Sequence, residues 1–271
     1  MIYCQELQKS FETKELLFSA LKESKEVIIA EKRSKIFNSC EKGLSVYTNQ
    51  NTIQKAIETV KSFEIDKDYY YFVVNSSRIL DSHKDLHIDG NWEQTVKQQQ
   101  GKVYLVWDHT LKRSEIIAMK EDIEMLTATI PFSMIGKSYE GDAYSLIYKV
   151  RKDKIINKEA KEWLEKGHEL EASVRMQYVK IDLALNSNSK EDEKEKLTYD
   201  KYYPTVANKE EVGEVNYFWV ISEAKNVMES SLVLFGSNPA TGQLRDIEAV
   251  NDTSKNEPTE VTQKTNRRIL I

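Results

Sequence analysis

The sequence predicts a mixed α+β protein, and three features carry this prediction. Short runs rich in β-branched and aromatic residues recur from about residue 68 onward, as is typical of strands. Amphipathic patterns with helical spacing lie before and between these runs. The chain of 271 residues has only nine glycines and four prolines, which are few for an all-β protein that spends them on tight turns. Helices and longer loops must therefore supply part of the connections.

Residues 1–62 form an N-terminal peripheral segment in this interpretation. "KELLFSALKES" at 14–24 has the apolar spacing of a helix, and "NTIQKAIETVKSF" at 51–63 predicts a second one. Between them, "EVIIAEKRSKIF" at 26–37 contains a β-branched run that predicts a strand.

The central part of the chain, residues 63–241, has the highest density of predicted strands. One stretch, "NKEAKEWLEKG" at 157–167, breaks the series with a helical pattern. Five β-rich runs precede it, at 68–80, 101–110, 113–120, 123–132 and 142–150.

A longer strand is predicted by "GHELEASVRMQYVKIDLAL" at 167–185. With a period of two, Leu170, Ala172, Val174, Met176 and Tyr178 share one face, so the strand should be half-buried. Ser173 then lies in mid-strand on the opposite, polar face, where we expect it to be exposed.

The last third of the chain alternates between polar and apolar stretches. Residues 186–198, "NSNSKEDEKEKLT", are densely charged and without apolar periodicity, which predicts a solvated loop. A helix is expected within 199–215, and a pair of strands at 216–225 and 230–236. From 242 to 271 the pattern is lost, and we expect a polar, disordered tail.

Composition narrows the classes of function. The formal net charge of −5 and the pI near 5.6 argue against a nucleic-acid surface, because such surfaces depend on clustered lysine and arginine. We therefore expect a protein or peptide partner. Only two cysteines are present, which favours a reducing cytosol, and no apolar run approaches the length of a membrane span. The start of the chain also lacks the pattern of a signal peptide.

Serine chemistry needs a base to remove the hydroxyl proton, so a histidine is the expected partner of Ser173. His109 ends the strand-like "VYLVWDHT", where an imidazole can lie at the rim of a cleft. "DSHKDLH" instead places Asp81, His83, Asp85 and His87 at two-residue spacing, a pattern acceptable for a divalent metal. Both readings stay open from the residues alone.

Four stretches in order resemble the prohead proteases of tailed phages, the maturation serine proteases whose fold is similar to herpesvirus assemblin. They are "LDSHKDLHIDGNW", "VYLVWDHT", "ELEASVRMQYVKIDLAL" and "AKNVMESSLVLFGSNPAT", spanning about residues 80 to 241. Their order and spacing are more specific than any one of them. The resemblance implies a mostly antiparallel, β-barrel-like core with flanking helices.

The same resemblance implies site residues. Ser173 would be the nucleophile and His109 the general base. The third member would be a carboxylate, with Glu229 in "VMESSLV" as first candidate and Glu171 as second. Arg175 stands where most of the family has glycine, and it would help to bind the oxyanion or pair with Glu171. Lys84 likewise replaces a glycine before Asp85, which affects the expected turn there.

The expected function is a prohead serine endopeptidase that cleaves scaffold protein, major capsid protein and itself, inside the assembling prohead in the bacterial cytoplasm. No cofactor, metal, nucleic acid or membrane is expected, and a homodimer is possible. One alternative is a catalytically inactive scaffold or capsid-assembly protein of the same fold. The other is a divalent-metal hydrolase that uses His83, Asp85 and His87.

Overall fold

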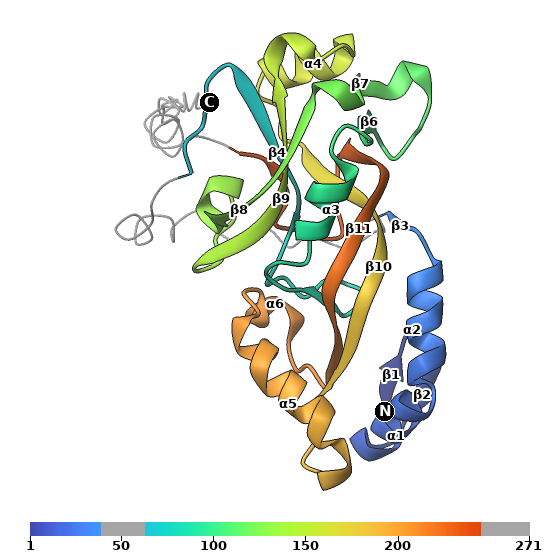
Figure 1. Ribbon diagram of the computed structural model, residues 1–271. Helices are drawn as coiled ribbons and strands as arrows, with labels where there is room; N and C mark the ends of the chain where they lie inside the picture. Colours follow the sequence, from blue (N-terminus) through green and yellow to red (C-terminus); the bar gives the residue numbers. More distant parts are fainter. Residues whose placement is uncertain (39–62, 245–271) are drawn as a thin grey trace, which may run out of the picture.

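The computed structural model describes residues 1–38 and 63–244, and these form a mixed α+β protein, as predicted (Figure 1). Their strands belong to three sheets and close no barrel, so the barrel-like arrangement expected from the resemblance is not present in the described part. In the same residues, no helix combines the length and apolar character needed to cross a membrane.

The largest sheet has six strands and is built around two long ones, β10 (Glu171–Leu185) and β11 (Tyr217–Val233). These two strands are antiparallel over nearly their whole length. The strand order is β3 (Phe37–Asn38), β10, β11, β6 (Tyr104–Trp107) and β7 (Ile116–Ala118). The sixth strand, β5 (Asp85–His87), runs parallel to β11, as does β6.

Two smaller sheets complete the strands. A four-stranded sheet has the order β12 (Gly242–Gln243), β4 (Tyr69–Ser76), β9 (Asp142–Arg151) and β8 (Ile123–Pro131), all antiparallel. Near the N-terminus, β1 (Ile2–Cys4) pairs with β2 (Lys9–Phe11). The strands predicted at 68–80, 101–110, 113–120, 123–132 and 142–150 are thereby confirmed.

Six α-helices in the described residues cover and connect the sheets. They are α1 (Lys14–Glu23), α2 (Lys25–Ser34), α3 (Glu93–Gln99), α4 (Lys158–Glu165), α5 (Glu193–Tyr202) and α6 (Lys209–Val212). The predicted helices at 14–24 and 157–167 are confirmed as α1 and α4. Each has a side-chain N-cap, in which Thr13 accepts from Leu16 N and Asn157 accepts from Ala160 N.

The strand predicted at 26–37 is wrong, because most of this stretch forms α2. Its buried residues Ile28, Ile29 and Lys32 lie on one face of the helix, against the main core. Burial of that face outweighs the strand preference of the β-branched run. Leu17, Phe18 and Leu21 of α1 belong to the same hydrophobic cluster as the core residues of β10 and β11.

The solvated loop predicted at 186–198 is also corrected, since α5 begins at Glu193. Two of its acidic residues are buried because lysines of the N-terminal helices neutralise them. Asp192 pairs with Lys22, and Glu195 pairs with Lys25 at 2.7 Å. These partners lie about 170 residues away in the sequence, so a charge pattern alone could not reveal them.

The stretch 199–215, where one helix was expected, instead contains the end of α5, the 3₁₀ turn Tyr203–Thr205 and the short helix α6. Pro204 is the second residue of that turn and cannot continue an α-helix. The predicted pair of strands at 216–225 and 230–236 is the single strand β11 with an irregularity at 226–230.

Parts of the predicted termini lie outside the described residues. The helix expected at 51–63 lies outside the described residues except for Phe63. The part of the expected tail from 245 onward also lies outside them. At the start of that tail, β12 pairs with β4, and Leu244 is buried.

Candidate active site

Three neighbouring strands of the large sheet bring Ser173, His109 and Glu229 together. Ser173 on β10 is the cross-strand partner of Ser231 on β11. Glu229 lies two residues before Ser231, so both side chains point to the same face of the sheet as Ser173. His109 follows the end of β6, which is the neighbour of β11 on its other side. The histidine therefore reaches the serine across the central strand.

An unbroken chain of hydrogen bonds joins these three side chains. His109 Nε2 lies 2.6 Å from Ser173 Oγ, and His109 Nδ1 lies 2.8 Å from Glu229 Oε1. A carboxylate can only accept, so Nδ1 carries the proton and donates to Glu229. Nε2 is then unprotonated and accepts from the Ser173 hydroxyl. This is the tautomer that a general base requires.

Ser231 is a fourth member of this network, and no sequence pattern indicated it. Its hydroxyl donates to Glu229 Oε2 at 2.7 Å and accepts from the main-chain N–H of His109 at 2.9 Å. One serine thus fixes the carboxylate and the backbone of the histidine together. Ser231 lies opposite Ser173 because of the register between β10 and β11. That register cannot be read from the sequence.

The backbone at His109 has an unusual conformation that turns its side chain over β11. Asp108 and His109 have φ values of 46° and 54°, in the left-handed region that non-glycine residues rarely adopt. Hydrogen bonds from Asp108 N to Leu232 O and from Thr110 N to Trp107 O hold this turn. Such strained residues persist where the surroundings determine the conformation, and they cluster at functional sites.

Glu229 is positioned by the irregularity in β11. Between the pairs Val174–Ser230 and Met176–Asn226, β11 has three residues opposite the single residue Arg175. Met228, inside this bulge, has a φ of 69°. A bulge re-aims the side chains at its own positions, and here Glu229 is its last residue.

The buried Asn226 side chain holds the bulge closed. Its Nδ2 donates to the carbonyl of Glu229 at 2.9 Å and to the carbonyl of Arg175 at 3.0 Å. Its Oδ1 accepts from the Tyr148 hydroxyl at 2.7 Å. The asparagine thus ties β10, β11 and β9 together directly behind the candidate site.

Ser173 is buried rather than exposed, which corrects the expectation from strand alternation. Its residue exposure is 0%, and the side chains of His109 and Glu229 are 5% and 0% exposed. The five residues predicted to face the core do so. The opposite face at Ser173 is covered as well, where the side chain of His109, which follows β6, lies against Ser173 Oγ.

The structure separates the two carboxylate candidates. Glu229 lies beside His109, whereas Glu171 accepts from Gly236 N at 2.6 Å and pairs with Lys137 at 3.3 Å. Arg175 is half-buried next to the site, opposite Asn38 of β3. Its Nε atom is buried and has no hydrogen-bond partner among the described residues. Glu171 thus contacts Gly236 and Lys137 instead of forming the expected pair with Arg175.

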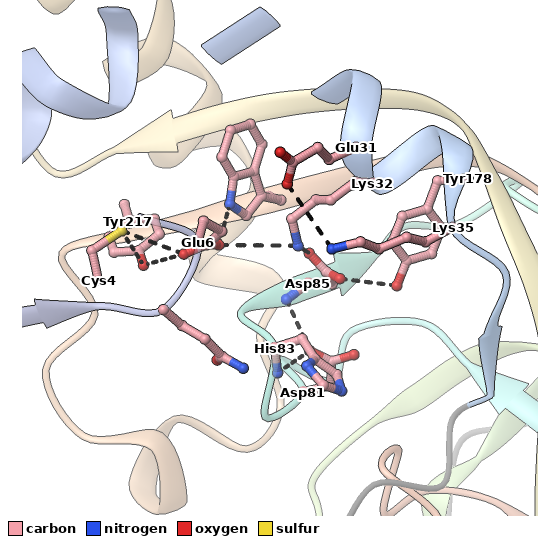
Figure 2. A network of polar contacts seen from close by, with 12 residues as sticks. Cys4, Glu6, Glu31, Lys32, Lys35, Asp81, His83, Asp85, Tyr178 and Tyr217 are labelled. Atoms are coloured by element: carbon pink, nitrogen blue, oxygen red, sulfur yellow. Dashed lines mark hydrogen bonds and ion pairs between the residues drawn. The ribbon is translucent and has the colours of Figure 1, made fainter. Parts of the chain in front are cut away.

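The residues proposed for a metal do not converge. Asp85 accepts from Lys32 Nζ at 2.6 Å and from the Tyr178 hydroxyl at 2.9 Å (Figure 2). The His87 ring instead stacks on Trp92, with Nδ1 at 2.7 Å from Asn91 Nδ2. Within residues 1–38 and 63–244, no three His, Cys, Asp or Glu side chains are arranged to hold a metal ion.

Figure 2 shows that Asp85 belongs to a network of polar contacts, in which Lys32 of α2 pairs with Asp85 of β5. Asp85 is buried, so these contacts link the N-terminal segment to the sheet. Burial lowers the pKa of Lys32, but the Asp85 carboxylate outweighs this effect and the net pKa is raised, so the pair is ionic. Burial, followed by repulsion from Asp85, raises the pKa of Asp81 above its ordinary range. Lys84, where the resemblance expects glycine, has a φ of 58° and thus adopts the conformation that glycine favours.

Comparison of the chain with models of known protein families, with curated proteins and with solved structures found no match.

Proposed function

We propose that this protein is a serine endopeptidase in which Ser173, His109 and Glu229 carry the reaction. The observation that supports this most is the hydrogen-bonded chain from Ser173 Oγ through His109 to Glu229, at 2.6 and 2.8 Å. A buried carboxylate, an imidazole and a serine hydroxyl in this order form the arrangement that activates serine for attack on a carbonyl.

In the proposed acylation step, Ser173 Oγ attacks the carbonyl carbon of the scissile peptide bond, and its proton moves to His109 Nε2. Glu229 stabilises the imidazolium that forms and holds its orientation. When the tetrahedral intermediate collapses, the C–N bond breaks and His109 passes the proton to the leaving amine. Water, deprotonated by His109, then hydrolyses the acyl-enzyme and restores Ser173.

Arg175 is our candidate for stabilising the oxyanion. It lies two residues after Ser173 on the same strand, and its buried Nε has no hydrogen-bond partner among the described residues. An unpaired buried donor is costly, so such groups are commonly explained by a ligand or by catalysis. A developing negative charge on the substrate oxygen would supply the missing acceptor.

We further propose that the substrates are those of a prohead protease, namely scaffold protein, major capsid protein and the chain itself, cleaved inside the assembling capsid in the bacterial cytoplasm. This part rests on the resemblance of the four sequence stretches, as do the herpesvirus-protease-like fold and a possible homodimer. The site geometry adds independent support for the reaction class, because the resemblance indicates Ser173 and His109, and hydrogen bonds join these two side chains to Glu229, the first of the two carboxylate candidates.

A catalytically inactive capsid-assembly protein of the same fold is the second candidate. The observation that favours it is Arg175, a bulky residue where the family has glycine, in a site whose serine is completely buried.

The deciding experiment compares the wild type with Ser173→Ala and His109→Ala, with Ser189→Ala as a control for a serine outside the network. One sample of each folded protein is treated with a fluorophosphonate. Separate untreated samples are incubated alone and with capsid and scaffold proteins, and all samples are analysed by mass spectrometry. The protease predicts labelling of Ser173 and new termini with the wild type and the control only. Unchanged masses and no labelling of any folded variant would favour the assembly protein.

A further inference from the structure

The strand that carries Ser173 has two edges, and both are occupied near the serine. One edge of β10 pairs with β11. The outer edge pairs with β3, whose Phe37 and Asn38 lie antiparallel to Met176 and Arg175 (Figure 1). The residues of β3 therefore take the main-chain positions beside β10 that begin two residues after the proposed nucleophile.

Side-chain contacts extend this coverage along the same edge. Phe37 stacks on Tyr178, with ring centroids 4.8 Å apart and an interplanar angle of 20°. Gln177 Nε2 donates to the carbonyl of Arg33, at the end of α2, at 2.9 Å. The chain from α2 to β3 thus follows β10 from Tyr178 to Arg175, toward Ser173.

This edge is also where an extended peptide would bind to the proposed protease. A peptide can add a strand to a sheet only along an edge with available main-chain groups, and it gains affinity from those hydrogen bonds. Because β11 fills the inner edge, the outer edge of β10 is the one that an added strand beside Ser173 would have to use. A substrate and β3 would compete for the same N–H and C=O groups.

The N-terminal segment is held firmly upstream of β3 and more weakly at β3 itself. Ile28 and Ile29 of α2 are buried in the main core, and Lys32 forms the buried ion pair with Asp85 (Figure 2). By contrast, β3 is two residues long, and Phe37 is only half-buried. The strand can therefore leave β10 while α2 stays in place.

We infer that the outer edge of β10, at Arg175–Gln177, is the peptide-binding edge of this protein, and that β3 is its resident occupant. The ligand is an extended peptide that pairs antiparallel to β10 and displaces β3. The N-terminal segment then limits its own enzyme's access to substrate. This inference rests on the proposed serine endopeptidase activity.

The first test weakens β3 by Phe37→Ala, which removes the stack on Tyr178. Ile36→Ala is the matched control, because Ile36 is the preceding residue and its side chain is exposed. Cleavage of a mixed-sequence decapeptide library is followed by mass spectrometry. Phe37→Ala should raise kcat/KM several-fold, because a larger fraction of molecules has an open edge, and Ile36→Ala should not. An equal or lower rate for Phe37→Ala would overturn the inference.

The second test locks β3 with Phe37→Cys and Met176→Cys, which are cross-strand partners and hence within reach of a disulfide. Cys40→Ser removes the nearest other thiol in the sequence. Oxidation should abolish cleavage of the library and reduction should restore it, while equal cleavage in both states would refute a competing strand.

Labelling by a small fluorophosphonate separates this inference from the proposed function. If neither the wild type nor the folded, reduced cysteine variant is labelled at Ser173, the proposed protease activity is wrong. If Ser173 is labelled and the cysteine variant cleaves the library equally in its oxidised and reduced states, only the proposed role of β3 is wrong. Labelling of proteins that cleave no peptide, Phe37→Ala included, would likewise rule out this edge as the peptide-binding surface.

Discussion

Ser173 on β10 and Ser231 on β11 are cross-strand partners, and each contacts a different part of the same histidine. Ser173 Oγ meets His109 Nε2 at 2.6 Å, whereas Ser231 Oγ accepts from the His109 main-chain N–H at 2.9 Å. The pairing of the two strands therefore helps to set the distance between the proposed nucleophile and its proposed base. Ser231 acts as a positioning residue in the proposed mechanism.

Replacing Ser231 should slow catalysis without removing it. Ser231→Ala deletes a hydrogen bond to the Glu229 carboxylate and one to His109, and bonds to charged groups are worth about 1.5–3 kcal/mol. We expect kcat to fall roughly ten- to hundredfold with little change in KM. Ser231→Thr keeps the hydroxyl and should recover most of the rate. An alanine variant with wild-type kcat would contradict the positioning role.

Replacing Glu229 should have a larger effect than replacing Glu171. Glu229→Gln keeps the shape but loses the charge that stabilises the imidazolium, so kcat should fall by roughly a thousandfold or more. Glu171→Gln should retain most of the activity, because Glu171 contacts Gly236 and Lys137 rather than His109. The rate of fluorophosphonate labelling, which reports the reactivity of Ser173, should fall in Glu229→Gln and stay near the wild-type rate in Glu171→Gln. The reverse result would make Glu171 the third member of the proposed triad.

Replacing Asn226 should destabilise the fold around the bulge. Asn226→Ala leaves the Tyr148 hydroxyl and the carbonyls of Arg175 and Glu229 without this partner in a buried place. We expect the free energy of unfolding to fall by about 2–4 kcal/mol in urea denaturation. Tyr148→Phe, which removes only the hydroxyl, should cost less. Equal stability of Asn226→Ala and wild type would show that the bulge does not depend on this side chain.

The buried His87 should make the protein sensitive to acid. Burial lowers the pKa of His87 to about 3, from the ordinary 6.5. Between these values the unfolded chain binds a proton that the folded protein excludes, so stability contributed by neutral His87 is lost as the pH falls from 6.5 toward 3. The loss is at most about 1.4 kcal/mol per pH unit.

His87→Phe removes this titration while keeping an aromatic ring on Trp92. The free energy of unfolding of wild type minus that of the variant should therefore decrease as the pH is lowered through this window. The carboxyl groups titrate in both proteins, so their contributions to the free energy of unfolding cancel in the difference. A difference that is independent of pH would show that His87 does not contribute to acid sensitivity.

Local pattern was sufficient for most strands. Alternation placed Leu170 to Tyr178 in a strand with one core face, and the β-rich runs gave β4, β6, β7, β8 and β9. Chemistry and the resemblance indicated Ser173 and His109, and they left Glu229 and Glu171 as the two carboxylate candidates. Nothing in the local pattern distinguished Glu229 from Glu171.

The tertiary structure decided what depends on partners distant in the sequence. It made 26–37 mostly helical because α2 buries one face on the sheet, and it ordered 193–198 because Lys25 neutralises Glu195. It buried Ser173 and identified Ser231, since both follow from strand register and from the bulge that Asn226 closes. A sequence determines which side chains a strand offers, but the neighbouring strands determine which of them meet.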